Sequence, residues 1–264
     1  MSVVGSILFG FYLAMVWVGL RMGLGLPFVV GGLVVFVWIQ YVIGTRGVLR
    51  QVGAVDLPRD DFRAFHEEFD RAAEGMGFEE PPRLMVTSMG VPNAFAVGRK
   101  NKGVVVVSIE LLELLDFDEA TAVAAHELAH LDNRDSILMV VGESISTIIG
   151  LVVFLLVSVS DSFVVSVAGW ILGVASKALV MLFVLALSRY REFAADRDAA
   201  RAMGSGDPLA RALSKIHLAS EGSEASVPGN VSALCILGGD DGLLARLFST
   251  HPSTERRIER LRDL

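Results

Sequence analysis

The hydrophobic positions of the chain are concentrated in four long apolar segments. They run at about 3–20, 27–43, 137–157 and 163–187. A helix that crosses a bilayer needs about 20 predominantly apolar residues, and each segment is close to that length. The first segment lacks the basic start and the small-residue cleavage site of a secretory signal peptide, so we expect it to be retained. The pattern predicts four transmembrane helices arranged as two hairpins.

The polar stretch between the two hairpins predicts a folded region with helices and a small sheet. After Pro58, apolar side chains recur at helical spacing at Phe62, Phe65, Phe69 and Met76. Short β-branched or alternating runs predict strands at 84–87, 94–98 and 104–108, with a hairpin turn at 99–103. A helix is then expected to begin at Asp116, capped together with Glu119 three residues later.

The remainder of the chain predicts a helix at 189–203, a Gly- and Ser-containing loop at 221–230 and a last helix at 253–261. We therefore expect an α+β, mainly helical fold with a small sheet, interrupted and anchored by four transmembrane helices. Its parts are a membrane hairpin at 1–48, a first catalytic part at 49–135, a second hairpin at 136–188 and a second catalytic part at 189–264.

Composition and charge narrow the class of protein. Hydrophobic residues make up 53% of the chain, which is too high for an ordinary soluble protein and favours the membrane. The net charge of −7 argues against nucleic acid as a partner, because no basic stripe is available to neutralise phosphates. The single cysteine, Cys235, excludes an internal disulfide framework.

Candidate chemistry lies in the helix that follows Asp116, where residues 126–130 read His-Glu-Leu-Ala-His. Helix positions four apart share a face, so His126 and His130 can reach one metal ion, with Glu127 beside them. A hydrolytic zinc site needs neutral nitrogen ligands, an open position for water and a carboxylate that takes the proton of the water. The motif predicts one Zn²⁺ per chain and Glu127 as general base.

The third zinc ligand is expected to be Glu192, because a carboxylate can complete such a site. Asp196 lies one helical turn further on the same face and is expected to accept a hydrogen bond from a ligand imidazole, that of His126. The alternative is that Glu192 and Asp196 belong to a solvated helix face with the neighbouring arginines. Two charges inside apolar segments, Glu143 and Lys177, are expected to pair or to line a cavity.

Charge at the segment ends predicts the topology. The connection at 158–162 has no Lys or Arg, whereas arginines flank the apolar segments on the side of the polar domains, at Arg46, Arg50, Arg134, Arg189 and Arg191. By the positive-inside rule the catalytic parts face the cytoplasm of a multi-pass protein of the cell membrane. Independently, a metal shared by His126 and Glu192 requires an even number of crossings between them.

Several motifs together resemble the HtpX-type membrane zinc metallopeptidases, relatives of the CAAX prenyl proteases. They are HELAH at 126–130, SRYREFAAD at 188–196, Asn93-Ala94-Phe95-Ala96-x-Gly98, and His251-Pro252 with Arg257 six residues after His251. The four-span layout is similar too, so the resemblance covers essentially the whole chain. It implies a zincin-like metallopeptidase domain. The family often has a second proline after the histidine, where Ser253 stands here.

The resemblance implies a role for each matching residue. His126, His130 and Glu192 bind zinc, and Glu127 is the general base and later the proton donor. The substrate-binding residues Asn93, Ala94, Phe95 and Ala96 form an edge strand to which a peptide adds by backbone hydrogen bonds. His251 and Arg257 approach the cleft and stabilise the oxyanion. For His251 and Asn93 the alternatives are a helix-start residue and a turn residue.

The expected function is that of an integral-membrane, zinc-dependent endopeptidase that acts on polypeptides, in a lipid bilayer. The resemblance implies membrane or misfolded proteins as substrates and a role in membrane protein quality control. Two alternatives stay open: a prenyl-protein (CAAX) processing peptidase, and a membrane adaptor that keeps the fold without catalysis.

Overall fold

The computed structural model describes residue 23 and residues 25–157, 162–221 and 252–264. The chain divides into two compact units, Met1–Gln51 and Val52–Leu264. Within the first unit, helix α2 spans Leu26–Gln51 and contains the second apolar segment. Its last turn carries Arg50, a cation that suits the partial negative charge of a helix C-terminus. The first apolar segment lies outside the described residues.

The second unit contains a small mixed sheet in the order β1-β2-β4-β3. Its strands are β1 (Val55–Asp56), β2 (Arg83–Thr87), β3 (Ala94–Val97) and β4 (Val104–Ser108). β4 is parallel to β2 and antiparallel to β3, with Val97 opposite Val104. The expected hairpin is therefore confirmed. Among the described strands, β3 pairs with β4 on one side only and forms an edge of this sheet.

The hairpin turn depends on backbone that few residues adopt. Asn101 has φ 63° and Gly98 has φ 113°. A Cβ atom on Gly98 would lie 2.8 Å from the Cα atom of Gly103, so only glycine fits there. These positions fix the register that keeps β3 at the edge of the sheet.

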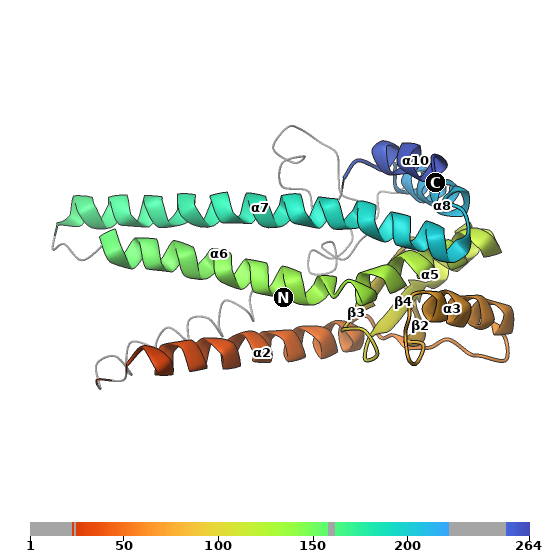
Figure 1. The fold of residues 1–264 in the computed structure, drawn as a ribbon, viewed down its shortest axis with the longest axis horizontal. Helices are drawn as coiled ribbons and strands as arrows, with labels where there is room; N and C mark the ends of the chain where they lie inside the picture. Colours follow the sequence, from red (N-terminus) through yellow and green to blue (C-terminus); the bar gives the residue numbers. More distant parts are fainter. Residues whose placement is uncertain (1–22, 24, 158–161, 222–251) are drawn as a thin grey trace. The chain divides into compact units, whose positions relative to one another are not determined.

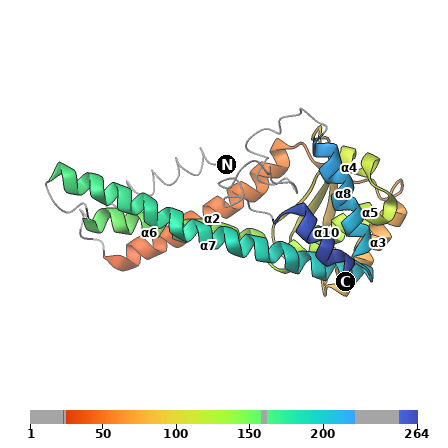
Figure 2. The same ribbon diagram turned by 90° about the horizontal axis from the view of Figure 1, so that it is seen from above.

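Helix α5 (Phe117–Asp132) lies at the centre of the second unit. It contacts β3 and helices α3 (Arg63–Gly75), α7 (Phe163–Met203) and α8 (Asp207–Glu221). Its start has the expected capping box, in which the Asp116 backbone N–H donates to the Glu119 carboxylate at 3.0 Å. Helix α4 (Ile109–Leu114) precedes it, and α10 (Thr254–Arg262) packs against α8, as Figures 1 and 2 show.

The amphipathic helix expected after Pro58 is α3, which is shorter than the pattern indicated. Phe65 and Phe69 are buried on its inner face. Phe62 and Met76 are instead its N-cap and C-cap residues. Met76 packs against the core just beyond the end of the helix, whereas Phe62 is exposed.

Helices α6 (Asp135–Val157) and α7 form a hairpin and lie side by side in both ribbon views (Figures 1 and 2). Gly142 packs against Val184, and a Cβ atom on Gly150 would lie 2.9 Å from the carbonyl oxygen of Gly173. Between them, the Ser146 hydroxyl donates to the Lys177 carbonyl at 2.8 Å. Small residues four positions apart let two helices approach closely.

Two charged residues, Glu143 and Lys177, lie within the apolar parts of this hairpin. The side chain of Glu143 lies outside the described part of the structure, and that of Lys177 is exposed. Their pairing stays a prediction.

Helix α7 is a single helix of 41 residues, about 60 Å long. It joins the fourth apolar segment to the helix expected at 189–203, so the boundary expected after 188 falls inside one helix. The sequence changes there from apolar to polar without a glycine or proline that would end a helix. The expected boundary therefore marks a change from apolar to polar surroundings along one continuous helix.

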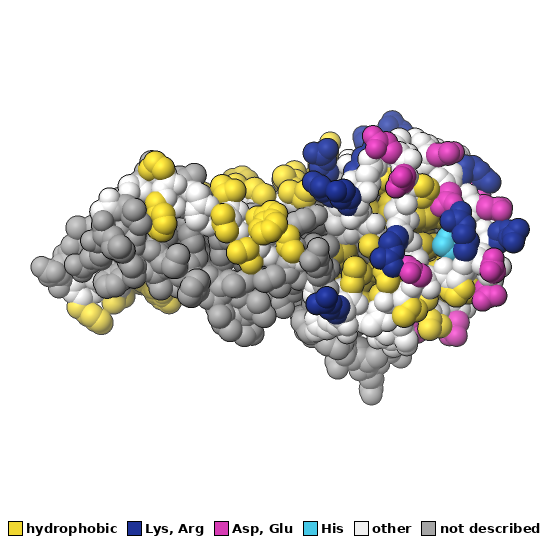
Figure 3. Space-filling model, turned by 90° about the horizontal axis from the view of Figure 1, so that it is seen from below, with side chains coloured by type: hydrophobic (Ala, Val, Ile, Leu, Met, Phe, Trp, Pro, Cys, Tyr) yellow, Lys and Arg dark blue, Asp and Glu magenta, His cyan; other side chains and the backbone are white. Residues whose placement is uncertain are grey.

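Among the described residues, α7 alone is long and apolar enough to cross a membrane by length and composition. The count of four spans stays a prediction. In Figure 3, the described Lys, Arg, Asp and Glu side chains gather together, apart from a stretch of exposed hydrophobic side chains.

Candidate metal centre

The two motif histidines project from α5 toward one point. The Nε2 atoms of His126 and His130 lie 3.1 Å apart, and the rings are nearly perpendicular at 87°. The two histidines are four residues apart on a helix, which places them on one face. Glu127 is buried beside them, and the potential ligand atoms of all three residues lie within 4.8 Å of one another.

Helix α7 brings Glu192 to the same point. Its Oε1 atom lies 3.4 Å from His130 Nε2, and its Oε2 atom lies 3.6 Å from His126 Nε2. α5 and α7 pack closely because both bury small side chains, among them Ala129 and Ala195. The carboxylate therefore reaches the imidazoles across the helix contact.

The spacing of these atoms fits one metal ion. The three separations are 3.1, 3.4 and 3.6 Å. Ligands bound tetrahedrally at about 2.0–2.1 Å from zinc lie about 3.3 Å from one another. Two imidazoles and one carboxylate are also a donor set that catalytic zinc uses. The residues thus match a divalent ion in distance and in chemistry.

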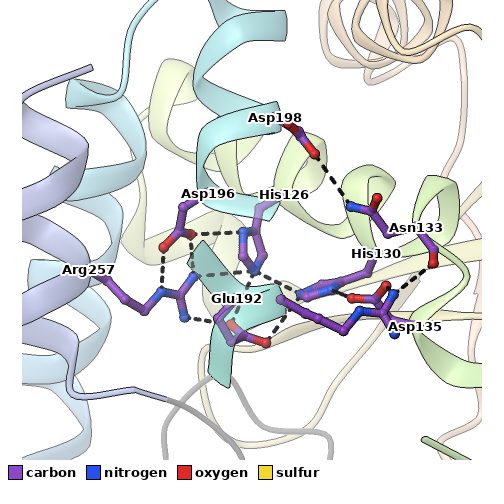
Figure 4. A network of polar contacts seen from close by, with 9 residues as sticks. His126, His130, Asn133, Asp135, Glu192, Asp196, Asp198 and Arg257 are labelled. Atoms are coloured by element: carbon purple, nitrogen blue, oxygen red, sulfur yellow. Dashed lines mark hydrogen bonds and ion pairs between the residues drawn. The ribbon is translucent and has the colours of Figure 1, made fainter. Parts of the chain in front are cut away.

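The far side of each imidazole faces a carboxylate. His126 Nδ1 lies 3.1 Å from Asp196 Oδ1, and His130 Nδ1 lies 2.6 Å from Asp135 Oδ2 (Figure 4). A carboxylate accepts the Nδ1 proton, which leaves the Nε2 lone pair of a neutral ring free to bind a metal. Two Nε2 atoms that face each other across 3.1 Å are held together either by a proton on one ring or by a metal ion between the rings, and Arg257 Nη2 also lies 3.3 Å from His126 Nε2.

A proton and a metal ion compete for this position. Burial alone lowers the pKa of His126, but its hydrogen bonds with Asp196 and Glu192 raise that pKa to about 9. Burial lowers the pKa of His130, despite the nearby Glu192. One proton on His126 therefore takes the place of the cation at neutral pH, and metal binding releases it.

Arg257 on α10 joins the carboxylates of this site and is 2% exposed. Its Nε and Nη2 atoms donate to Asp196 at 2.9 and 2.7 Å, and Nη1 lies 3.0 Å from Glu192 Oε2. Burial lowers the pKa of Arg257, but the carboxylates of Asp196 and Glu192 raise it above its ordinary value. The resemblance implies that Arg257 stabilises the oxyanion, and its guanidinium lies against the metal-site carboxylates and 3.3 Å from His126 Nε2.

The expected substrate strand lies beside this centre. Asn93 is buried, and its backbone N–H donates to the Ser108 hydroxyl at 2.9 Å, so it precedes β3 at a fixed place. Ala94, Phe95 and Ala96 belong to β3, which contacts α5. Their role in binding substrate is not tested by these contacts. His251 lies outside the described residues.

Two residues that sequence reasoning did not assign to the site belong to it. Asp135 contacts His130, and Arg191 forms an ion pair with Asp135. Arg191 stood out in the sequence only as a charge that flanks a membrane segment. Asp135 had no periodic relation to the motif, because it follows His130 by five residues across the end of α5.

A helix that carries His-Glu-x-x-His and meets a carboxylate from a second helix defines a metal-dependent peptidase. The model of peptidase family M48 matches residues 60–264. A protein named Protease HtpX homolog from Halobacterium salinarum is 42% identical over 298 aligned positions that span the whole of both chains. A protein of the same name from Methanopyrus kandleri is 36% identical, over 78% of this chain and 68% of its own length.

The chain belongs to peptidase family M48 and is a metallopeptidase. A solved structure, that of S. mikatae Ste24p, is similar in fold with a TM-score of 0.64 and 18% sequence identity. The similarity covers 98% of this chain and 62% of that one, so the chain spans less than two thirds of the length of Ste24p.

Proposed function

We propose that this metallopeptidase is an integral-membrane endopeptidase that uses one Zn²⁺ ion. The observation that carries the proposal is the convergence of His126 Nε2, His130 Nε2 and the Glu192 carboxylate within 3.1 to 3.6 Å. Glu127 stands beside that point. Zinc is favoured over harder cations because two of the three ligands are imidazoles.

Each residue of the site has a chemical task in this proposal. Zinc, when bound, lowers the pKa of a water toward 7 and polarises the carbonyl that is attacked. Glu127 takes the proton from the attacking water and gives it to the leaving amine. Asp196 holds His126 with its Nε2 lone pair toward the ion. His251 retains the oxyanion role that the resemblance implies.

The edge strand β3 supplies a place for the substrate. A peptide in extended form adds to such an edge by backbone hydrogen bonds. The β3–β4 turn is fastened to the metal helix, because Lys100 donates to Asp132 at 2.5 Å and Leu131 packs against Gly103. This contact keeps β3 at a constant distance from the residues that bind the ion.

We further propose that the catalytic parts face the cytoplasm and that the substrates are membrane or misfolded proteins, as expected for membrane protein quality control. The arginines that flank the apolar segments support this orientation. Cysteine probes test it, since Cys235 is the only thiol to remove. A cysteine at Ser160 is expected to react with an impermeant reagent in intact cells, and one at Ser223 only after permeabilisation. The reverse pattern contradicts the orientation.

The enzymatic test uses the full chain purified in detergent. Zinc content and casein cleavage are measured with and without a chelator, for the native chain, Glu127→Gln and, as a matched control, Glu113→Gln on the exposed side of α4. We expect about one zinc per chain in all three and cleavage in all but Glu127→Gln. Bound zinc without cleavage in the native chain would support the adaptor, and cleavage confined to a prenylated peptide would support the prenyl-protein peptidase.

A further inference from the structure

His130 has its own carboxylate partner, separate from the one at His126. His130 Nδ1 lies 2.6 Å from Asp135 Oδ2, the shorter of the two imidazole–carboxylate contacts. The side chain of Asp135 is 14% exposed, so water competes little for it. Asp132 is closer to His130 in the sequence, but its carboxylate pairs with Lys100 instead.

A strained turn places Asp135 against the imidazole. Helix α5 ends at Asp132, and Asp135 is the first residue of α6. Between them, Arg134 has φ 56°, a left-handed conformation that is uncommon for residues other than glycine. A carboxylate in the first turn of a helix is itself favoured by the partial positive charge of the helix N-terminus. The turn between α5 and α6 thus places the Asp135 carboxylate against the imidazole of His130.

Arg191 holds the same carboxylate from the other side. It forms an ion pair with Asp135, donates from Nη2 to the Asn133 carbonyl at 2.7 Å and is 11% exposed. Arg191 precedes the ligand Glu192 on α7. Figure 4 shows the resulting order, in which Asp135 lies against His130 at one side of the site and Asp196 against His126 at the other.

Each histidine therefore contacts an aspartate, and each of these aspartates contacts an arginine. His126 contacts Asp196, which Arg257 binds with two hydrogen bonds. His130 contacts Asp135, which Arg191 binds. An arginine bound to a carboxylate fixes the orientation of that carboxylate and favours its ionised form. The two arrangements differ in the number of arginine contacts but have the same order of residues, which indicates the same task for both aspartates.

We propose that Asp135 is a positioning residue for the metal centre, which orients His130 by accepting its Nδ1 proton while Arg191 holds the carboxylate in place. The proposal rests on the proposed function, since it concerns the direction in which His130 Nε2 presents its lone pair to the ion. Asp135 contacts His130 and Arg191 and is not one of the proposed zinc ligands. Its loss is expected to weaken metal binding roughly 10- to 100-fold, as for other partners of metal-bound histidines.

The test measures metal binding directly. The full chain in detergent is stripped of metal, and the zinc dissociation constant is obtained by competition with a chromogenic chelator. We expect a 10- to 100-fold rise for Asp135→Ala, a smaller rise for the isosteric Asp135→Asn, and a return toward the native value for Asp135→Glu. Asp132→Asn is the matched control for zinc binding, because Asp132 pairs with Lys100 of the β3–β4 turn and does not contact the ring; this variant should bind zinc as the native chain does, whatever its effect on cleavage.

Two further measurements separate positioning from a general loss of structure. Co²⁺ bound in place of zinc reports the ligand geometry by its absorption, which should change in Asp135→Ala and not in Asp132→Asn. Arg191→Gln removes the ion pair but keeps the imidazole contact, so it should weaken zinc less than Asp135→Ala. Native zinc affinity and an unchanged Co²⁺ spectrum in Asp135→Ala overturn the inference. Equal losses in Asp132→Asn overturn it as well. Failure of the native chain to bind zinc instead overturns the proposed function.

Discussion

Arg257→Met removes a buried cation from between two carboxylates and leaves the volume of the side chain nearly filled. In the native chain the guanidinium makes two hydrogen bonds to Asp196 and lies 3.0 Å from Glu192. Both carboxylates are almost fully buried. Without Arg257 they lose their compensating charge inside the protein, where water cannot replace it. We therefore expect a loss of stability as well as of activity.

The magnitude follows from the burial of the pair. Removal of one partner of a buried ion pair costs about 3–5 kcal/mol of unfolding free energy. For a folded unit of this size, each kcal/mol shifts the melting temperature by about 2–4 °C, which gives a fall of about 6–20 °C. Bound zinc would supply positive charge beside Glu192 but not beside Asp196. The fall in melting temperature should therefore be larger in metal-free protein. Arg257→Lys keeps the charge but not the two-pronged hydrogen bond and should lie in between.

Thermal unfolding of metal-bound and metal-free protein in detergent measures this, together with casein cleavage. Arg256→Met is the matched control, because Arg256 is the exposed neighbour of Arg257 on the same helix. A melting temperature of Arg257→Met within about 2 °C of the native value, combined with lost cleavage, would contradict a stabilising role of the buried ion pairs. That result would favour the oxyanion role that the family resemblance implies for Arg257.

Three further predictions follow from the site and its surroundings. Glu127→Gln should keep zinc and lose at least about two orders of magnitude in cleavage rate, because only the proton transfer is removed; a nearly native rate contradicts the role of base. Glu192→Ala should lose zinc and activity together, and Asp196→Asn should bind zinc roughly 10- to 100-fold more weakly, as metal analysis after dialysis will show. Burial raises the pKa of Glu110, but hydrogen bonds from the Ser88 hydroxyl and from neighbouring backbone N–H groups outweigh it and lower the pKa below 4.5. A carboxyl group whose pKa is lower in the folded than in the unfolded protein stabilises the fold at a pH above its unfolded pKa. This stability is lost as the pH falls below about 4.5, so the metal-free native protein should lose more unfolding free energy in that range than Glu110→Gln.

Features of the fold that depend on neighbouring residues could be predicted from the sequence. The capping box at Asp116 and the turn before Gly103 are local, and the structure confirms both. The parallel pairing of β2 with β4 could not be predicted, because the partners come together only through the intervening hairpin. The sequence did not indicate that α7 continues through Ser188. The hydrophobic pattern changes there because the surroundings of the helix change, and this change says nothing about whether the backbone stays helical.

The site shows the same division. The sequence indicates His126, His130 and Glu192 because their types and helical spacing suit a metal, and the structure brings them together. It does not indicate Asp135, whose place depends on the left-handed turn at Arg134. No periodic pattern reports such a turn, and arginine is not a residue that signals it.

The charges of the site explain why it uses two Asp–Arg pairs and two glutamates. In their ionised forms, four carboxylates stand against two guanidinium groups, those of Glu127, Glu192, Asp135 and Asp196 against Arg191 and Arg257. Arg191 neutralises Asp135, and Arg257 neutralises Asp196 while it also lies 3.0 Å from Glu192, so both aspartates orient the histidines without adding net charge to the interior. The two glutamates leave a charge of −2 where little water is available to screen it. A divalent cation bound between the histidines brings that charge to zero, whereas a monovalent cation or the single proton of His126 does not.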